Sequence, residues 1–200
     1  MVTAASSVLA AKKATTTIPI VMTSSADPVA LGLVASLARP GGNVTGNSSL
    51  SPELNTKRLE ILKAAVIKLA GVGVLRQSAV GPSGGQSGDI QLKELRAAAL
   101  ALKLKLEEIE THLDAKALES AFESAKYKQV NAIMTHSNPS FFAERKRIVE
   151  LAGKYRLAAI YPQKDFVVEG GLMFYGTDSA DLFRRAAVYV DKILKGRQTG

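Results

Sequence analysis

Short polar segments follow several of the chain's apolar runs, and they hold the side chains best suited to bind a small ligand. Thr23–Ser25 supplies three hydroxyls directly after the apolar run Ile18–Met22. Comparable segments with little charge begin at Arg76, His136 and Gln163. Such hydroxyl and amide groups hold a small polar molecule by hydrogen bonds, but they include no paired nucleophile and base. The pattern therefore favours a binding protein over an enzyme.

The carboxylates and histidines form no catalytic or metal-binding pattern. His112 and His136 are the only histidines, and their spacing does not match a pair of metal ligands. The sequence has no cysteine, which excludes thiolate metal sites and cysteine nucleophiles. We expect no catalytic residue, no metal and no cofactor. Helix capping explains the carboxylates that precede predicted helices, although one of them also neighbours the Thr23–Ser25 hydroxyls: Asp27, Asp89, Asp114 and Asp178.

A glycine-rich segment, Gly81–Gly88, lies between a predicted strand and a predicted helix, where phosphate-binding loops occur. It fits neither GxxxxGK[ST] nor GxGxxG, and Pro82 removes one backbone donor. The segment is better interpreted as a surface loop. A nucleotide-using α/β enzyme built on it remains the less favoured alternative.

Composition indicates a globular chain without a nucleic-acid surface. The 200 residues carry a net charge of +8 and are 46% hydrophobic, enough for substantial cores. The basic residues are spread along predicted helices and mixed with acidic ones, without interleaved aromatic residues. This distribution is typical of solvated helix faces, so we expect no nucleic-acid partner. No apolar run reaches the length of a transmembrane helix.

The segment 18–46 predicts a strand, a polar loop, a helix and a second strand. Ile18–Met22 has the continuous apolar character of a buried parallel strand, and Val44-Thr45 begins the next strand. Between them, Asp27 is placed as an N-cap and Pro28 at the first helical position. A helix N-terminus beside a strand end predicts a site for a small polar or anionic ligand. The expected inner face of this helix is Val29, Leu33, Val34 and Leu37.

The rest of the chain alternates strands and helices, which predicts parallel sheets covered by helices. Strands are expected at 72–75, 104–109, 130–134 and 158–161, with the end of another at Val2-Thr3. Helices are expected at 6–14, 89–102 and 139–155, after Asp114, and from Asp178 or Ser179. A further helix has Leu59, Leu62, Val66 and Leu69 on its inner side, with Asn55, Lys57, Glu60 and Lys63 opposite. The last helix has the inner face Leu182, Phe183, Ala186, Val190, Ile193 and Leu194.

Two breaks in this alternation divide the chain into two expected lobes. The polar segment Asn47–Pro52 resembles a hinge, and Glu169–Gly171 forms the second break. The segments are therefore 1–47 for part of a first lobe, 48–168 for a second lobe, and 169–200 for a return to the first. The predicted fold class is α/β with two Rossmann-like lobes and parallel sheets, and one continuous sheet is the alternative.

Three motifs in the chain resemble those of a known family. They are IPIVMTSSADPVALGLVASLARPGGNVTG, SPELNTKRLEILK and GGLMFYGTDSADLFRRAAVYVDKILKG, within a similarity that runs from about Thr3 to Gly196. The chain resembles the ABC transporter substrate-binding proteins of the type I periplasmic-binding fold, in the group that binds tryptophan and other aromatic amino acids. The resemblance implies a periplasmic or cell-surface binder that captures a small solute, delivers it to a membrane permease and catalyses no reaction. It also implies a fragment, with the first lobe incomplete.

The resemblance places ligand-binding residues on both walls of an inter-lobe cleft that closes by a hinge. A ligand-sensing effector domain of a regulator or receptor with the same fold is the alternative function. Candidate stacking residues for an aromatic ligand are Tyr161, Tyr175 and Phe141. The full set of expected ligand-binding residues is Thr23, Ser24, Ser25, Asp27, Gln77, Ser137, Asn138, Gln163 and Tyr175.

Overall fold

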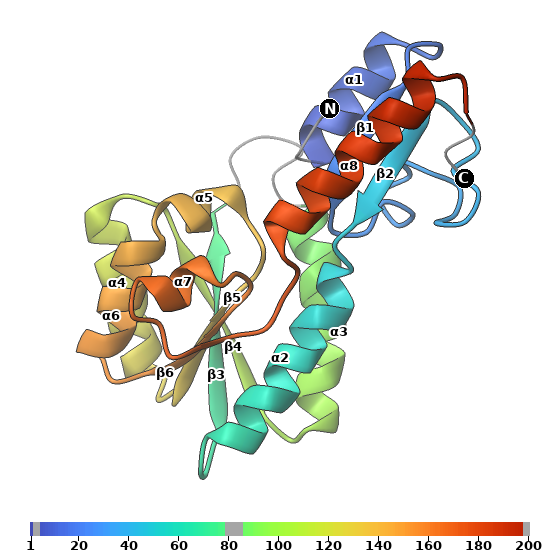
Figure 1. Ribbon diagram of the computed structural model, residues 1–200. Coiled ribbons are helices and arrows are strands. Elements are labelled where there is room, and N and C mark those ends of the chain that lie inside the picture. The colour runs from blue at the N-terminus through green and yellow to red at the C-terminus, as the bar shows by residue number, and fades with distance from the viewer. Residues whose placement is uncertain (2–4, 79–85, 198–200) are drawn as a thin grey trace. The chain divides into compact units, whose positions relative to one another are not determined.

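The computed structural model describes residues 1, 5–78 and 86–197, which divide into two compact units. Unit 1 takes its described residues from 1–50, 86–90 and 177–197, and unit 2 takes its from 51–78 and 91–176. Both units combine helices with parallel strands (Figure 1). The predicted strand end at Val2-Thr3 and residues 81–85 of the glycine-rich segment lie outside the described residues.

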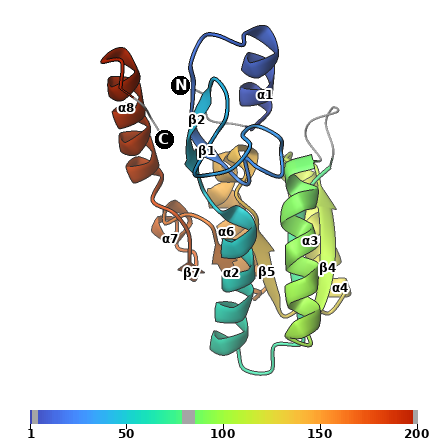
Figure 2. The ribbon, with the colours of Figure 1, turned by 90° about the vertical axis from the view of Figure 1, so that its right-hand side faces the viewer.

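Unit 2 is a five-stranded parallel sheet with the strand order β4-β3-β5-β6-β7. Helices α2 and α3 lie along one face of this sheet, and α4 and α6 lie along the other (Figures 1 and 2). Its strands are β3 (Gly71–Gln77), β4 (Lys105–Thr111), β5 (Ala132–Thr135), β6 (Ala158–Tyr161) and β7 (Met173–Phe174). Its helices are α2 (Ser51–Ala65), α3 (Gln86–Ala101, from Gln91 on), α4 (Ala115–Tyr127), α5 (Pro139–Ala143), α6 (Arg145–Lys154) and α7 (Asp165–Val168).

Two hydrophobic clusters, one on each face, hold the sheet of unit 2 in place. Val74 and Met134 pack with α2 and α3, while Leu75 and Ile133 pack with α4 and α6. Successive strand residues point to opposite faces, so a sheet covered on both sides needs apolar residues at every position. This requirement explains the apolar runs of the inner strands β3, β5 and β6, whereas the edge strand β4 includes charged residues.

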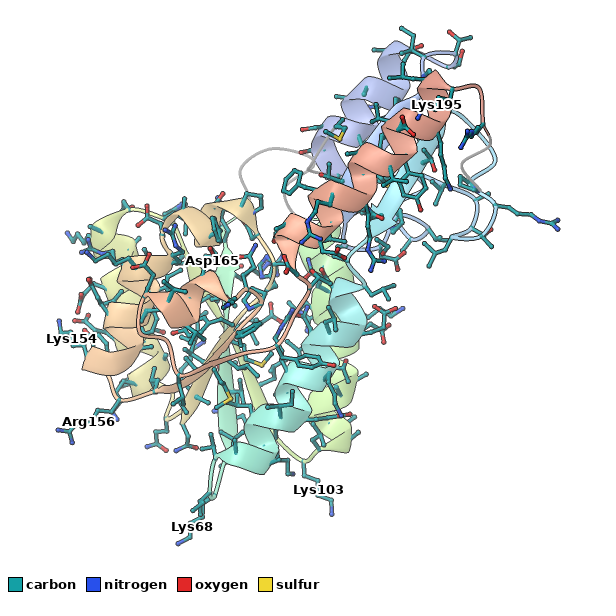
Figure 3. The ribbon with its side chains drawn as sticks, viewed as in Figure 1. Lys68, Lys103, Lys154, Arg156, Asp165 and Lys195 are labelled. Atoms are coloured by element: carbon teal, nitrogen blue, oxygen red, sulfur yellow. The ribbon has the colours of Figure 1, made fainter. Side chains whose placement is uncertain are left out.

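Three helices of unit 2 end in the same hydrogen-bonded turn at the amino ends of the strands. Lys103, Gln129 and Arg156 have left-handed backbone conformations, with φ of 55°, 56° and 53°. The next residue in each case is a buried Leu or Val whose N–H bonds to an alanine carbonyl five residues back, over 2.9–3.3 Å. This is the Schellman arrangement, in which glycine normally occupies the left-handed position. Figure 3 shows Lys103, Arg156 and Lys68 at one end of unit 2 and Asp165 at the other.

Glycine at these three positions is expected to stabilise unit 2. A residue with a Cβ is strained in the left-handed region, and glycine removes this strain from the folded state. Glycine also gives the unfolded chain more conformational entropy, which lowers stability. We expect the first effect to exceed the second by about 0.5 kcal/mol of unfolding free energy per site. The triple variant Lys103→Gly, Gln129→Gly, Arg156→Gly should therefore raise the free energy of unfolding by about 1.5 kcal/mol, measured by urea titration. The control Lys126→Gly, in the last turn of α4 at a residue with helical geometry, should lose up to about 1 kcal/mol. A destabilised triple variant would contradict this explanation.

Unit 1 is a two-stranded parallel sheet with helices packed on it. Its elements are α1 (Ala5–Ala14), β1 (Ile20–Ser25), β2 (Val44–Ser48) and α8 (Ser179–Leu194). Val8 of α1 packs with Ile20 and Met22 of β1 and with Val44 of β2. The predicted first helix and the two predicted strands are thus present, but β1 begins two residues later than expected and continues through Ser25.

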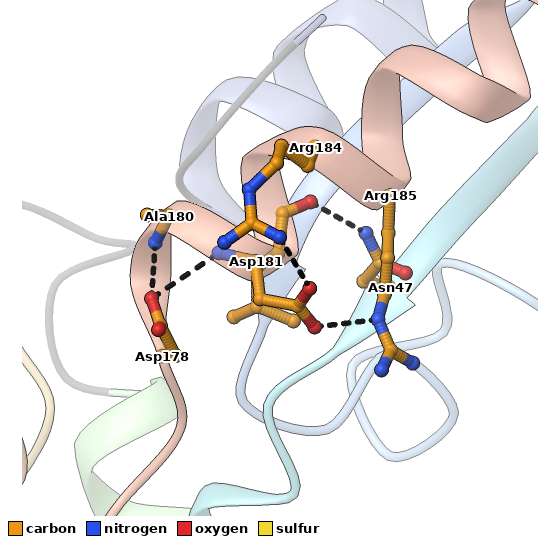
Figure 4. Close-up of polar contacts among 7 residues, drawn as sticks. Asn47, Asp178, Ala180, Asp181, Arg184 and Arg185 are labelled. Atoms are coloured by element: carbon orange, nitrogen blue, oxygen red, sulfur yellow. Dashed lines mark hydrogen bonds and ion pairs between the residues drawn. The ribbon is translucent and has the colours of Figure 1, made fainter.

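The amino end of α8 is fixed by polar contacts that Figure 4 shows. Asp178 is the N-cap, as predicted, and its Oδ1 accepts hydrogen bonds from the backbone of Ala180 and Asp181. Asp181 pairs with Arg184 and Arg185 one turn further on. Asn47, at the end of β2, donates from Nδ2 to the Leu182 carbonyl over 3.0 Å and so links the strand to the helix.

The predicted helix after Asp27 is wrong, because the chain forms only a single turn there. Asp27 Oδ1 does accept from Val29 and Ala30, and the Leu31 N–H bonds to the Asp27 carbonyl. Gly32 then has φ of 65°, and the next N–H turns back to the Pro28 carbonyl, which ends the helical geometry. Leu33 and Val34 of the expected inner face are buried, whereas Val29 and Leu37 are 40% and 58% exposed.

Three other helix predictions need correction. The expected helix 139–155 is two helices, because the backbone leaves helical geometry at Glu144. Helix α3 begins at Gln86, so Asp89 lies in its first turn and is not the N-cap. Only Ala186 of the expected inner face of α8 is buried, since two strands offer too little surface to cover a 16-residue helix.

Candidate functional site

The candidate site lies at the carboxyl edge of the sheet of unit 2. Strand order reverses between β3 and β5, because the chain passes from β3 outward to β4 and then returns to β5. In open α/β sheets ligands bind outside the carboxyl ends of the strands at this switch point. Gln77 ends β3, and Ser137 and Asn138 follow β5, so three predicted residues flank the switch point. The Asn138 Nδ2 donates to Gln77 Oε1 over 3.2 Å and joins the two loops.

Two of the predicted residues also have structural roles at this edge. Asn138 is the N-cap of α5, and its Oδ1 accepts from the Ser140 N–H over 2.7 Å. The Tyr175 N–H donates to the Tyr161 carbonyl over 3.0 Å, which extends the pairing of β7 with β6. The segments after β6 and β7 therefore lie side by side, with Gln163 in the first and Tyr175 in the second.

Several buried polar atoms at this edge have no hydrogen-bond partner among the described residues. They are Thr135 Oγ1 at the end of β5, Tyr161 Oη at the end of β6, and Gln163 Oε1. Thr135 and Tyr161 continue the register in which Met134 pairs with Ile160, so the two residues are neighbours on adjacent strands. Buried polar atoms normally find a partner in the protein, in water or in a ligand. This part of the edge thus has unused capacity to bind a polar group.

The three aromatic residues expected to stack on a ligand differ in exposure. Phe141 and Tyr161 are core residues, and the Tyr161 ring stacks on Phe166 with centroids 4.6 Å apart. Burial raises the pKa of Tyr161, which keeps its hydroxyl protonated. Phe141 and Tyr161 are therefore unsuitable for stacking. Tyr175 is 39% exposed and is the candidate that could meet a ligand ring.

Arg58, which the sequence analysis did not select, is a buried cation at the same edge. It lies on α2 and is 1% exposed, and its Nε donates to the Tyr175 carbonyl over 2.5 Å. Its Nη1 donates to Asn55 Oδ1, and Asn55 Nδ2 donates to Gln91 Oε1 over 3.1 Å. Asn55 is therefore buried, contrary to its predicted place on the polar side of the helix. The spacing of Asn55, Arg58 and Leu62 by three and four residues was the available signal, because it places all three on one helix face.

His136 is held neutral at the loop after β5. Burial lowers its pKa to about 4, a hydrogen bond to the Leu75 backbone acts in the opposite direction, and the charges of Arg58 and Arg76 lower the pKa further. Its ring meets Phe141 edge to face at 5.3 Å. At neutral pH this residue is an uncharged member of the site.

Stability is expected to fall on acidification because of His136. Between pH 6.5 and pH 4 the unfolded chain binds a proton at this residue while the folded chain does not, so stability rises with pH in this window. From pH 7 to pH 4.5 the loss from this residue alone should be roughly 2 kcal/mol. Urea titrations at pH 7 and pH 4.5 give the loss of unfolding free energy for each protein. This loss should be smaller by that amount in His136→Gln than in the parent chain. His112→Gln, at an exposed position, should lose as much as the parent chain. Equal drops in all three proteins would contradict the prediction.

The predicted residues of unit 1 lie at the carboxyl end of β1. Thr23 and Ser25 are buried and Ser24 is partly exposed, and all three belong to the strand and not to a loop. The Ser25 carbonyl accepts from the Ser49 N–H over 2.8 Å. The Oγ of Ser25 is a buried atom without a hydrogen-bond partner among the described residues. Because Asp27 caps a single turn, the helix N-terminus proposed as an anion site is absent from the described structure.

The described residues contain no group of three His, Asp or Glu side chains that could hold a metal ion. None of their helices is both long and apolar enough to cross a membrane.

The architecture is that of the periplasmic-binding proteins of type I, and comparison with known proteins gives the family. Residues 1–200 match the family described as ABC transporter substrate binding protein, and the chain belongs to that family. A tyrosine-binding protein from Clostridioides difficile is 28% identical over 192 residues, which are 96% of this chain and 53% of the relative. Members of this family are binding proteins and not enzymes, which confirms the prediction that the chain is not an enzyme.

Solved structures show the same fold. A conserved domain protein from Vibrio cholerae matches with a TM-score of 0.84 and 28% identity, over 98% of this chain and 63% of that one. The ABC domain in complex with L-Trp from Streptococcus pneumonia matches with a TM-score of 0.82 and 24% identity, over 97% and 63%. The chain thus spans between half and two thirds of the length of these relatives, and the predicted α/β fold class is confirmed.

Proposed function

We propose that this chain belongs to the solute-binding component of an ABC importer and that the solute is an aromatic amino acid. The observation that carries this proposal is the family match over residues 1–200, together with a relative described as a tyrosine-binding protein. The L-Trp complex of a protein with the same fold gives further support. The family match favours transport over the alternative of a regulator's effector domain.

The proposed binding residues of unit 2 are those at the carboxyl edge of its sheet. Their uncharged side chains, the nearby atoms without partners and the exposed Tyr175 ring suit a zwitterion with an aromatic side chain. Unit 1 would contribute the hydroxyls at the end of β1. The proposed set is Thr23, Ser24, Ser25, Asp27, Gln77, Ser137, Asn138, Gln163 and Tyr175.

The proposed mechanism is hinge closure between the two lobes of the whole protein. A ligand that touches both lobes only in the closed state shifts the equilibrium toward closure by its differential affinity. The closed form would then deliver the solute to a membrane permease from the periplasm or the cell surface. These steps follow from membership of the family and require no chemical reaction.

A thermal-shift screen of the twenty amino acids tests the proposed ligand. A ligand that binds only the folded state at about 100 times its Kd adds about 2.7 kcal/mol of stability. For a chain of this size, that gain raises the Tm by roughly 5–10 °C. We expect such shifts with L-tyrosine or L-tryptophan and none with L-lysine or L-glutamate. A response confined to non-aromatic amino acids would reject the aromatic assignment.

A further inference from the structure

The charge of Arg58 has no anionic partner in the described structure. Its side-chain hydrogen bonds go to a backbone carbonyl and to an amide oxygen, which are both neutral. None of the ion pairs among the described residues includes Arg58. Buried charges are normally paired, because removing a guanidinium from water is costly. Burial lowers the pKa of Arg58 to about 10, so the group keeps its charge at neutral pH.

The Arg58 guanidinium lies close to loops that carry the candidate site. Arg58 Nε bonds to the Tyr175 carbonyl after β7, and an added Cβ on Gly176 would lie 3.4 Å from Arg58 Nη2. The same added Cβ would lie 1.9 Å from the Pro162 carbonyl, which follows β6. Arg58 also contributes to the lowered pKa of His136, after β5. The guanidinium therefore lies beside the segments that follow two adjacent strands, β6 and β7.

The candidate residues at the carboxyl edge bring no negative charge to oppose it. The candidate residues of unit 2 are uncharged, and they are Gln77, Ser137, Asn138, Gln163 and Tyr175. Arg76, the other nearby cation, is paired with Glu108 over 3.2 Å. A fixed cation in a setting of low dielectric attracts an anion far more strongly than it would in water.

We propose that Arg58 determines ligand specificity by supplying the positive potential that selects a carboxylate at the carboxyl edge of unit 2. The inference rests on the proposed function and adds which group of the amino acid unit 2 recognises. The Nε and Nη1 of Arg58 donate hydrogen bonds to the protein, so the residue acts on the ligand through its electrostatic field. Arg58 is therefore a positioning residue. The ligand class is therefore a free carboxylic acid, and amides or amines of the same shape are rejected.

The test compares L-tyrosine with L-tyrosinamide, which has the same shape and amine but a neutral amide in place of the carboxylate. Isothermal titration gives the ratio of the two Kd values for each protein. We expect the parent chain to prefer L-tyrosine by at least tenfold. Arg58→Gln should reduce this ratio to threefold or less, mainly by weakening L-tyrosine, whereas Arg58→Lys should retain most of it. Lys57→Gln removes an exposed charge one residue away and should leave the ratio unchanged.

A second variant tests the role of the positive charge without removing the guanidinium. Asn55→Asp places a carboxylate against Arg58 Nη1 and neutralises its charge in place, so this variant decides if Arg58→Gln does not fold. A role limited to structure would weaken both ligands equally and leave the ratio unchanged, and that result overturns the proposal. A parent chain that binds both ligands equally also overturns it. If only a non-aromatic amino acid binds, the proposed function fails, and the same ratio measured with that amino acid and its amide still decides the role of Arg58.

Discussion

Gly176→Ala is expected to reduce the free energy of unfolding of unit 2 by about 3 kcal/mol or more. An added Cβ would lie 1.9 Å from the Pro162 carbonyl oxygen and 2.9 Å from its carbon. Both are backbone atoms, so the chain after β6 must separate from the chain after β7. The hydrogen bond from Tyr175 N–H to the Tyr161 carbonyl would be lost with it.

The matched control is Gly153→Ala, in α6, where an added Cβ meets no atom within 4 Å. Alanine there should stabilise the helix by about 0.5–1 kcal/mol. Urea titrations of the two variants should therefore shift in opposite directions from the parent chain. If Gly176→Ala is as stable as the parent chain, the close packing of the segments after β6 and β7 is contradicted.

Phe166→Ala is expected to cost about 3–5 kcal/mol, the range for truncating a fully buried aromatic residue. Phe166 is 0% exposed, stacks on Tyr161 and meets Phe142 edge to face at 6.5 Å. The Phe166 N–H bonds to the Gln163 carbonyl, which ties the loop after β6 to the position of residue 166. Loss of side-chain packing at residue 166 should therefore loosen this loop along with the core. Thermal and urea unfolding measure the first effect, and proteolysis within residues 162–170 measures the second.

Phe174→Ala is the control, because Phe174 is 42% exposed and its truncation removes little buried area. A loss of about 1 kcal/mol or less is expected there. Similar losses for the two variants would show that the aromatic cluster under the loop after β6 is not packed as described.

Patterns that arise from burial predicted most of the fold of unit 2. The inner strands β3, β5 and β6 contain buried apolar runs because both faces of the sheet are covered, and Asp114 caps the helix that it precedes. The helix after Asp27 failed because one residue, Gly32, adopts a left-handed conformation that a helical pattern does not reveal.

The candidate site was predictable where it follows strand ends and not where it depends on tertiary packing. Gln77 and Asn138 were expected near strand ends, and the structure joins them by a hydrogen bond. Arg58 was missed because a charged residue in the middle of a helix is normally solvated. Phe141 and Tyr161 were candidates by residue type alone, and only the packing showed that they belong to the core.

The location of the ligand is the central claim, and amide chemical shifts of ¹⁵N-labelled protein during titration with L-tyrosine test it most directly. We expect the largest changes in unit 2 at 77–78, 135–138, 161, 163 and 174–176, with almost none around Lys103, Gln129 and Arg156 at the opposite end of the sheet. Changes centred on those three turns, or no changes at saturating L-tyrosine, would contradict a binding site at the carboxyl edge.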